Sequence, residues 1–213
     1  MRRKLVAVLV VLGALLVMAA QCPFDPDLPD PDPEPTPGTV LFFDDFEVGV
    51  DPRLSLTSGN WEAVDGEIHS TTEDASAHVI DGASWVNYEA EVDTRTEEDR
   101  PWLIPYRGVA VRANGEQDYV VFYGSTQSMW FWVYRDGVRD DSYHGKVNQP
   151  LPDDCNIRVR VVGSHYEAFV NDVLVSQFDY DGPTSGTAGF RLRGNQDNQE
   201  AVWFDNFRVT AIE

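Results

Sequence analysis

Three carboxylates at alternating positions, Glu89, Glu91 and Asp93, are the first residues of this sequence whose spacing suggests chemistry. Successive side chains of a β-strand point to opposite faces, so this spacing places all three acids on one face. Paired carboxylates can act as nucleophile and general acid in the cleavage of a glycosidic bond. The same spacing is typical of a strand with a solvated acidic face, and the next residue in the alternation, Arg95, is a cation. We therefore expect an acidic surface strand and assign no catalytic residue.

Aromatic side chains form a second pattern, because the run 129–135 is apolar at every position before its terminal arginine. Alternation gives such a strand two apolar faces, one of which carries Trp130 and Trp132. The preceding segment repeats the pattern with Tyr119 and Tyr123. A strand of a two-sheet β-sandwich needs only one apolar face for the core. The second face is therefore either covered by other parts of the chain or available to stack on sugar rings. The sequence leaves both interpretations of these four rings open.

Arginines alternate with apolar residues in several predicted strands and should therefore point away from the core. Arg112 alternates with Val109 and Val111, and Arg191 and Arg193 have the same relation to their apolar neighbours. A guanidinium group binds vicinal hydroxyls or carboxylates in a forked geometry. We predict that these three arginines bind carbohydrate together with the aromatic residues, and Arg112 is the strongest candidate. The alternative is pairing with Asp and Glu on neighbouring strands.

Acidic residues near both ends of the predicted domain suggest a calcium site. Asp44, Asp45 and Glu47 lie near its start, and Asp205 and Asn206 lie near its end. In a β-sandwich of two antiparallel sheets, the first and last strands pair. This pairing would bring these oxygen ligands together in the manner that Ca²⁺ prefers. Paired aspartates at strand ends also cap turns, which is the alternative. No other cofactor is expected, because the four histidines lack the spacing of zinc ligands.

Short strands are the elements that must position these residues, because no segment after residue 39 shows sustained helical periodicity. The dipeptides Asp65–Gly66, Asn114–Gly115 and Asp136–Gly137 separate alternating or aromatic-rich runs. Such pairs suit two-residue hairpin turns, in which both central residues have positive φ. About a dozen strands within residues 40–213 predict an all-β fold with two antiparallel sheets, a jelly-roll sandwich.

The segment 1–21 is predicted to be an export signal, with a basic start and an apolar run whose length suits a signal sequence rather than a membrane span. Small residues lead to Cys22, which resembles the lipid attachment site of bacterial lipoproteins, although Gln21 stands where Gly or Ala is usual. Cleavage after Ala19 or Ala20 is the alternative. We expect a protein at the cell envelope or outside the cell, held to a membrane by a lipid on Cys22.

Residues 22–39 are predicted to be an extended linker, because most of them alternate Pro with Asp or Glu. In the polyproline II conformation, this segment reaches on the order of 50 Å. Such a linker holds a domain away from a surface, which favours anchoring. Only Cys155 then remains as a cysteine of the folded part, so neither a disulfide framework nor a cysteine metal site is expected.

Charge restricts the class of partner. The chain has 16 Lys and Arg against 36 Asp and Glu, which gives a formal net charge of −20. A surface this acidic repels phosphate backbones, so no nucleic-acid partner is expected. Plain colloidal solubility also explains the charge.

Seven segments of the chain resemble, in their order, the concanavalin A-like lectin and glucanase superfamily. They read VLFFDDFEVG, NWEAVDGEIHS, YEAEVDTR, GVAVRANGEQDYVVFYG, IRVRVVGSHYEAFVNDVLVSQF and GFRLRGN followed by AVWFDNFRVT. The resemblance is to the laminin G-like and 3-keto-disaccharide hydrolase-type domains, and it implies a concanavalin A-like sandwich over 40–213. It also implies that the sheet containing GVAVRA holds a ligand. Laminarinase-type enzymes of this fold carry an E-x-D-x-E strand, which is not intact here because Arg95 takes the final acid position when the motif is read from Glu91.

These observations predict an exported, non-catalytic carbohydrate-binding or adhesion module whose partner is a glycan. The superfamily hosts binding modules, adhesion domains and glycosidases, so the fold does not choose among them. The first alternative is a glycoside hydrolase of the same fold with an unrecognised site. The second is a structural surface protein that binds another protein.

Overall fold

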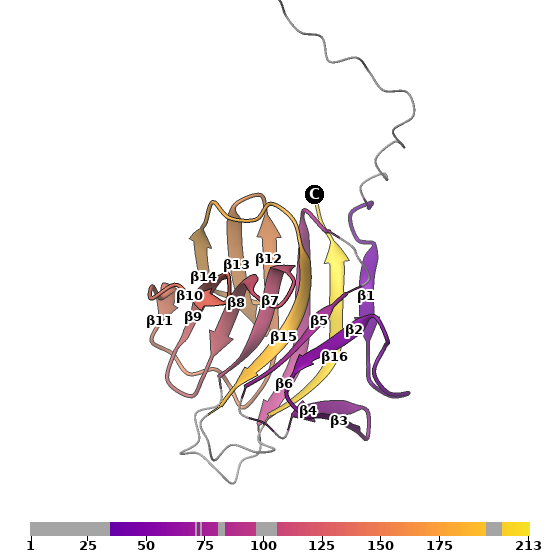
Figure 1. The fold of residues 1–213 in the computed structure, drawn as a ribbon. Coiled ribbons are helices and arrows are strands. Elements are labelled where there is room, and N and C mark those ends of the chain that lie inside the picture. Colours follow the sequence, from indigo (N-terminus) through magenta and orange to yellow (C-terminus); the bar gives the residue numbers. More distant parts are fainter. Residues whose placement is uncertain (1–34, 71, 73, 81–83, 97–105, 195–201) are drawn as a thin grey trace, which may run out of the picture. The chain divides into compact units, whose positions relative to one another are not determined.

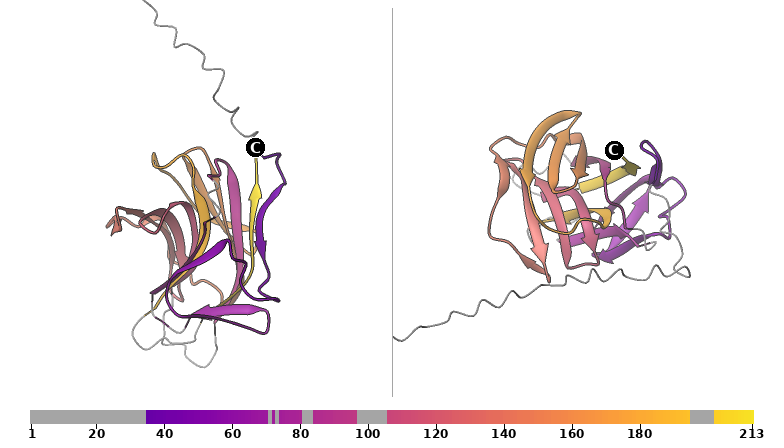
Figure 2. Two further views of the ribbon diagram at one scale, coloured as in Figure 1. Left: turned by 45° about the vertical axis from the view of Figure 1, so that its right-hand side comes forward. Right: turned by 90° about the horizontal axis from the view of Figure 1, so that it is seen from above.

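The computed structural model describes residues 35–70, 72, 74–80, 84–96, 106–194 and 202–213. Within these ranges the regular elements are sixteen β-strands, which form two antiparallel sheets of eight strands each. Both sheets curl, and they pack face to face as a sandwich (Figure 1). Figure 2 shows the two layers from the side and from above. The prediction of an all-β jelly-roll sandwich is confirmed.

Sheet I has the strand order β14-β13-β12-β6-β16-β4-β3, and β1 also pairs with β16. Its strands are β1 (Val40–Asp44), β3 (Trp61–Val64), β4 (Glu67–Ser70), β6 (Tyr88–Thr96), β12 (Asp154–Val162), β13 (His165–Val170), β14 (Val173–Asp179) and β16 (Val202–Ala211). The pairing of β1 with β16 joins the two ends of the domain, as the sequence predicts.

Sheet II has the strand order β10-β9-β8-β7-β15-β5-β2, and β11 also pairs with β9. Its strands are β2 (Leu54–Ser58), β5 (Asp74–Val79), β7 (Tyr106–Asn114), β8 (Asp118–Gly124), β9 (Met129–Arg135), β10 (Val138–Arg139), β11 (His144–Val147) and β15 (Thr187–Arg193). All seven residues that the sequence suggests for carbohydrate binding lie in this sheet.

The core lies between the sheets and is built by alternation along the long strands. In β12 every second residue is buried, and the buried set is Cys155, Ile157, Val159 and Val161. Phenylalanine rings join the two layers, because Phe190 of β15 lies 4.7 Å from Phe204 of β16 between ring centroids. Each such buried side chain contributes roughly 1.5–3 kcal/mol to folding. The long strands thus assemble by burying one face each.

Two of the three predicted two-residue turns are confirmed. Asp65 and Gly66, between β3 and β4, have φ angles of 53° and 81°, and Asp136 and Gly137, between β9 and β10, have 50° and 74°. Positive φ at both positions matches the right-handed twist of the flanking strands.

The prediction for the third turn is wrong, because Asn114 is itself paired, with Asp118, and three residues connect β7 to β8. Of the predicted turn pair, only Gly115 has a positive φ, at 73°. The cause is a bulge in β7, where the pairing register shifts between Val111 and Asn114. One extra residue in a strand reverses the facing of the side chains that follow it.

Candidate carbohydrate-binding site

The outer face of sheet II carries an apolar cluster that is separate from the sandwich core. Its buried members come from β7, β8 and β9 and are Ala110, Ala113, Tyr119, Val121, Tyr123, Trp130 and Trp132. The intervening side chains of the same strands, such as Phe122 and Phe131, belong to the core between the sheets. Strands β8 and β9 are therefore apolar on both faces, as the sequence predicts.

Trp132 shows that these rings form neither the sandwich core nor an open platform. Its side chain is only 4% exposed. The guanidinium carbons of Arg139 and Arg193 lie 4.4 Å and 5.3 Å from its ring, where cation–π attraction favours them. Trp130, at 4% exposure, packs against Tyr106 and Tyr143 with centroid distances of 5.4 Å each. The rings that the sequence identified are thus a buried floor under cations and other rings.

Tyr119 and Tyr123 belong to the same floor, with exposures of 3% and 1%. Tyr119 stacks on Tyr134 at 4.5 Å, and the guanidinium carbon of Arg191 lies 4.5 Å from the Tyr119 ring. Burial lowers the pKa of Arg191 to about 10, so this side chain is still a cation at neutral pH. Arg191 and Arg193 therefore lie on the outer face, as the alternation predicts, beside the aromatic residues.

A pocket of about 570 Å³ opens at one side of this floor. We call it the ring pocket, and its described lining residues are Tyr106, Gln127, Ser128, Trp130, Trp132, Arg139, Tyr143, Lys146, Arg193 and Gly194. Tyr143 is 51% exposed and presents an accessible ring, over which the Lys146 ammonium lies at 5.2 Å. A volume of this size is typical of ligand pockets, and rings with polar groups beside them suit a sugar.

The sequence interpretation missed seven of the ten described residues of the ring pocket, and four of the seven carry a ring or a positive charge: Tyr106, Tyr143, Arg139 and Lys146. Tyr106 lies on the same face of β7 as Gly108 and Ala110, opposite the core-facing Val109. The alternation of the sequence could therefore have predicted that Tyr106 lies on the outer face. The other three of these four residues come from β10, β11 and the loop before β11, which are too short for a periodic signal.

The prediction that Arg112 faces a ligand is wrong, because its side chain is 0% exposed and lies inside the domain. The bulge in β7 gives Arg112 a φ of 54° and takes it out of alternation with Val109 and Val111. Its guanidinium group donates hydrogen bonds to the carbonyl oxygens of three other segments, at Trp85, Gly163 and Thr184.

The backbone of Arg112 also makes a buried contact: its N–H donates a hydrogen bond to the Tyr88 hydroxyl at 2.6 Å. That hydroxyl donates in turn to the Thr187 carbonyl at 2.8 Å, and burial raises the pKa of Tyr88. Gly186 packs so closely on the bulge that a Cβ there would lie 2.5 Å from the Arg112 carbonyl carbon. Arg112 thus joins loops at one end of the sandwich rather than binding a ligand at the ring pocket.

The three acids of β6 share the outer face of sheet I, as predicted, and engage partners there. Glu89 pairs with Arg158 at 3.0 Å, Glu91 lies 3.8 Å from Arg208, and Asp93 accepts a hydrogen bond from Asn156. Burial raises the pKa of Glu91, and the charge of Glu89 raises it further. The ring pocket lies on the outer face of the other sheet, so the acids and the pocket are on opposite sides of the sandwich.

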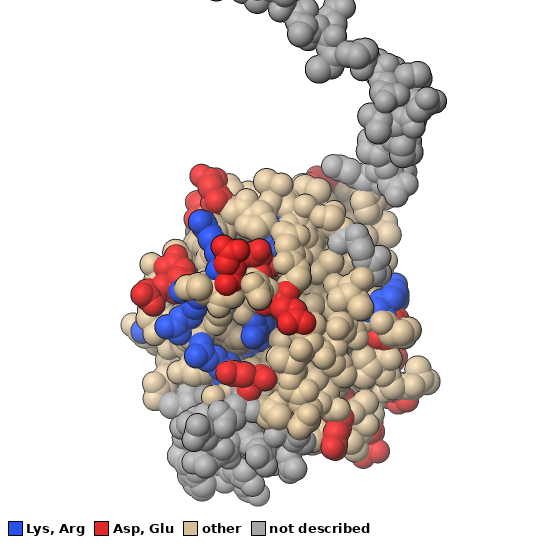
Figure 3. Space-filling model, viewed as in Figure 1, with Lys and Arg blue, Asp and Glu red and all other residues tan. Residues whose placement is uncertain are grey.

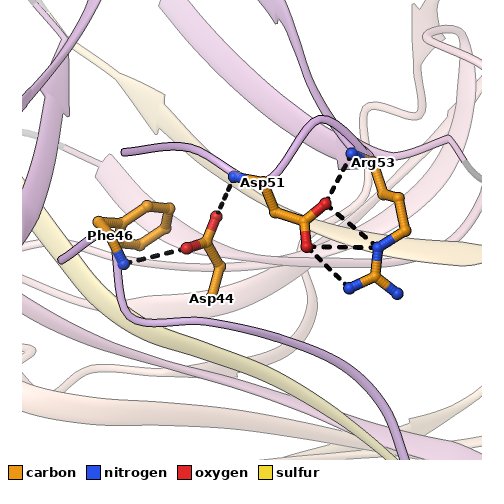
Figure 4. Close-up of polar contacts among 4 residues, drawn as sticks. All are labelled: Asp44, Phe46, Asp51 and Arg53. Carbon is orange, nitrogen blue, oxygen red and sulfur yellow. Dashed lines mark hydrogen bonds and ion pairs between the residues drawn. The ribbon is translucent and has the colours of Figure 1, made fainter. Parts of the chain in front are cut away.

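Asp44 acts as a turn cap rather than as an open metal ligand. Its two carboxylate oxygens accept backbone hydrogen bonds from Phe46 at 3.0 Å and from Asp51 at 2.7 Å, and Asp51 in turn pairs with Arg53 (Figure 4). The alternative interpretation of this aspartate as a strand-end cap therefore fits its contacts.

The predicted calcium ligands Asp45 and Asp205 are close enough to influence each other. Burial raises the pKa of Asp205, and the charges of Asp93, Glu67 and Asp45 raise it further. Asn206 donates hydrogen bonds to Asp93 and Asp205 at 3.0 Å. Within the described ranges no group of three or more His, Cys, Asp or Glu is arranged to hold a metal ion. The calcium ion stays a prediction.

The export signal, Cys22 and most of the linker lie outside the described residues. Cys155 has a free, buried thiol, and burial raises its pKa. Among the described residues no helix is long and apolar enough to cross a membrane.

Solved structures with a similar fold share little sequence with this chain. Carbohydrate binding module CBM66 from Bacillus subtilis has a TM-score of 0.60 at 14% identity, over 75% of this chain and 96% of that chain. The VIP36 exoplasmic/lumenal domain in its Ca²⁺/Man3GlcNAc-bound form has 0.62 at 10% identity, over 80% and 88%. A β-glucanase from Bacillus licheniformis has 0.58 at 11% identity, over 83% and 99%. No protein-family model and no curated protein matches the sequence. The likeness shows the fold, that of concanavalin A-like lectins and glucanases.

Proposed function

We propose that this domain is a non-catalytic carbohydrate-binding module that takes a glycan into the ring pocket. The observation that carries the proposal is the pocket itself, where accessible rings and polar side chains converge on the outer face of sheet II. A sugar presents apolar C–H faces that stack on rings and hydroxyls that accept hydrogen bonds from Arg and Lys. Two proteins of similar fold, one called a carbohydrate binding module and one solved with Man3GlcNAc, support this choice.

We expect Tyr143→Ala to weaken glycan binding by roughly threefold to tenfold, because one stacked ring contributes about 0.5–1.5 kcal/mol. Half of the Tyr143 side chain is exposed, so its removal should leave folding nearly intact. The measurement is a glycan array with the purified protein, followed by titration calorimetry on the best glycan.

Phe43→Ala is the matched control, because Phe43 is a half-buried ring under Arg208 on the outer face of sheet I. Equal losses in both variants would contradict binding at the ring pocket. Release of reducing ends from a polysaccharide by the wild type, abolished by Glu91→Gln, would favour a glycoside hydrolase. Binding of a protein but of no glycan would favour the structural surface protein.

We further propose that the module is exported and held to a membrane by a lipid on Cys22, with residues 22–39 as its spacer. The basic and apolar segments before Cys22 support export, and the proline-rich spacer supports anchoring. Cys22→Ser should then move the protein from the membrane fraction to the soluble fraction, as measured by fractionation of expressing cells. Unchanged partitioning would leave an ordinary cleaved or an uncleaved signal as the better account.

A further inference from the structure

The ring pocket has a local charge opposite to that of the whole protein. Its described lining contains three cations, Arg139, Lys146 and Arg193, and no Asp or Glu. The chain as a whole has 36 acidic residues against 16 Lys and Arg. Figure 3 shows Lys and Arg atoms gathered on the left of the molecule, with Asp and Glu atoms around them, in the region where Figure 1 labels β7 to β11. In an acidic protein, such a cluster is an exception that requires a reason.

Arg158 on the other sheet has two close carboxylate partners, whereas among the described residues the cations of the ring pocket have no carboxylate nearer than 3.8 Å. Arg158 of β12 pairs with both Glu89 and Asp172 at 3.0 Å. In the pocket, Arg193 lies 3.8 Å from Asp74, whose side chain is 64% exposed. Exposed pairs of this kind contribute only about 0–1 kcal/mol, so an incoming anion can replace them at little cost.

Arg139 and Lys146 are compensated even less than Arg193. Arg139 lies 3.9 Å from Asp141, whose side chain is 102% exposed. Within the described part of the chain, Lys146 has no carboxylate at ion-pair distance, and its ammonium group lies over the Tyr143 ring. The three cations come from three strands, β10, β11 and β15, that meet around the same rings. Their positive charge is therefore available to a ligand.

We propose that the ring pocket binds glycans whose pyranose units carry an anionic group, either the carboxylate of a uronate or a sulfate ester. This inference rests on the proposed carbohydrate-binding function and adds the chemical class of the sugar. The pyranose ring would stack beside Tyr143, and its anionic oxygens would accept charge-assisted hydrogen bonds from Arg139, Arg193 and Lys146. The net charge of the domain does not prevent this, because distant surface charges are screened within about 8 Å at physiological ionic strength.

The first test changes only the charge of the ligand. Binding to polygalacturonate, to its fully methyl-esterified form and to dextran sulfate is measured by titration calorimetry with the full protein. We expect the methyl ester, which keeps the backbone but loses the charge, to bind roughly tenfold or more weakly than polygalacturonate. A preference for dextran sulfate over polygalacturonate would support the anionic class and assign sulfate as the group.

The second test removes single cations from the protein. Arg139→Gln, Arg193→Gln and Lys146→Gln should each weaken binding of the preferred polyanion by roughly tenfold. Lys146 is exposed, so its variant is expected to fold even where loss of an arginine disturbs Trp132. Arg208→Gln is the matched control and should leave binding unchanged, because Arg208 lies over Phe43 at 4.7 Å and near Glu91 at 3.8 Å on the other sheet.

The possible outcomes distinguish a failure of the anionic specificity from a failure of the proposed carbohydrate-binding function. Equal binding of the charged and esterified polymers, or losses in Arg208→Gln as large as those in Lys146→Gln, would overturn the anionic specificity. If Tyr143→Ala still lost binding to a neutral glycan, the carbohydrate-binding function would survive that result. Absence of binding to every glycan would overturn both.

Discussion

Arg112→Ala should lower the free energy of unfolding by roughly 3–5 kcal/mol, as measured by urea denaturation. The guanidinium group holds the carbonyl oxygens of Trp85, Gly163 and Thr184, which belong to three different segments. Removal of the side chain would leave the buried Trp85 carbonyl without this donor, release the loops that carry the exposed residues Gly163 and Thr184, and open a cavity where the buried side chain lies. The size of the loss follows from three hydrogen bonds and the packing of a fully buried side chain together, not from one hydrogen bond.

Two further substitutions at this position distinguish its side chain from its backbone. Arg112→Gly should be less damaging than Arg112→Ala by roughly 1 kcal/mol, because glycine adopts the observed φ of 54° without strain. Arg112→Lys keeps the charge but cannot reach all three carbonyls, so it should lie between the wild type and Arg112→Ala.

The control for this series is Arg160→Ala, since Arg160 is 43% exposed and lies 3.9 Å from Glu167. We expect a change within about 0.5 kcal/mol there. A folded Arg112→Lys protein should keep the glycan affinity of the ring pocket. If Arg112→Ala lowered the free energy of unfolding by less than about 1 kcal/mol and also abolished glycan binding, Arg112 would instead be a ligand-binding residue.

Strand faces were predictable wherever the alternation of the sequence is unbroken. In β9 the odd and even positions separate into core residues such as Phe131 and outer residues such as Trp132, and β8 behaves alike. The same rule placed Arg191 and Arg193 correctly, because β15 keeps its register with β5 across both residues. Periodicity is enough here because each strand has neighbours on both sides that fix its orientation.

The error at Arg112 has a local physical origin that the sequence does not reveal. The residues before it, Val109 and Val111, alternate normally, and nothing in their types marks the bulge that follows. Positive φ is uncommon for arginine, so sequence reasoning would not place it in this conformation. The carbonyl groups that accept hydrogen bonds from Arg112 stabilise the bulge, and they come from segments far away in the chain.

The cationic character of the ring pocket could not be predicted for a different reason. Arg139 and Lys146 reach it from β10 and β11, strands of two and four residues that both pair with β9. Elements this short carry no periodic pattern, and their side chains are placed by the partner strand. The aromatic floor was thus visible in the sequence, whereas the charges above it required the tertiary pairing.

A buried histidine of sheet II should lower the free energy of unfolding of the domain in acid. His78 of β5 is 4% exposed, and neither ring nitrogen has a hydrogen-bond partner among the described residues. Its ring lies 5.8 Å from Tyr119. Burial lowers the pKa of His78 from 6.5 to about 3, and the positive charge of Arg191 lowers it further. The folded domain therefore keeps this imidazole neutral.

The sign of the effect follows from linkage between protonation and folding. Above the unfolded-state pKa of 6.5 the imidazole is neutral in both states and does not affect stability. As the pH falls below that value, the unfolded chain binds a proton that the folded domain does not, so the free energy of unfolding falls until the folded pKa of about 3 is reached. Between about pH 7.5 and about pH 5, the loss from His78 alone is about 2 kcal/mol.

His78→Phe should remove this loss, because phenylalanine fills the same site, breaks no hydrogen bond and does not titrate. We expect the variant to match or exceed the wild type at about pH 7.5, and to be more stable by a further 2 kcal/mol or so at about pH 5. The measurement is urea denaturation at both pH values, and His165→Gln, whose side chain is 42% exposed, controls for loss of an accessible imidazole. Parallel losses of stability in wild type and His78→Phe would mean that the folded domain binds the proton at His78, and that the surroundings of His78 and Tyr119 are more accessible to water than their contacts imply.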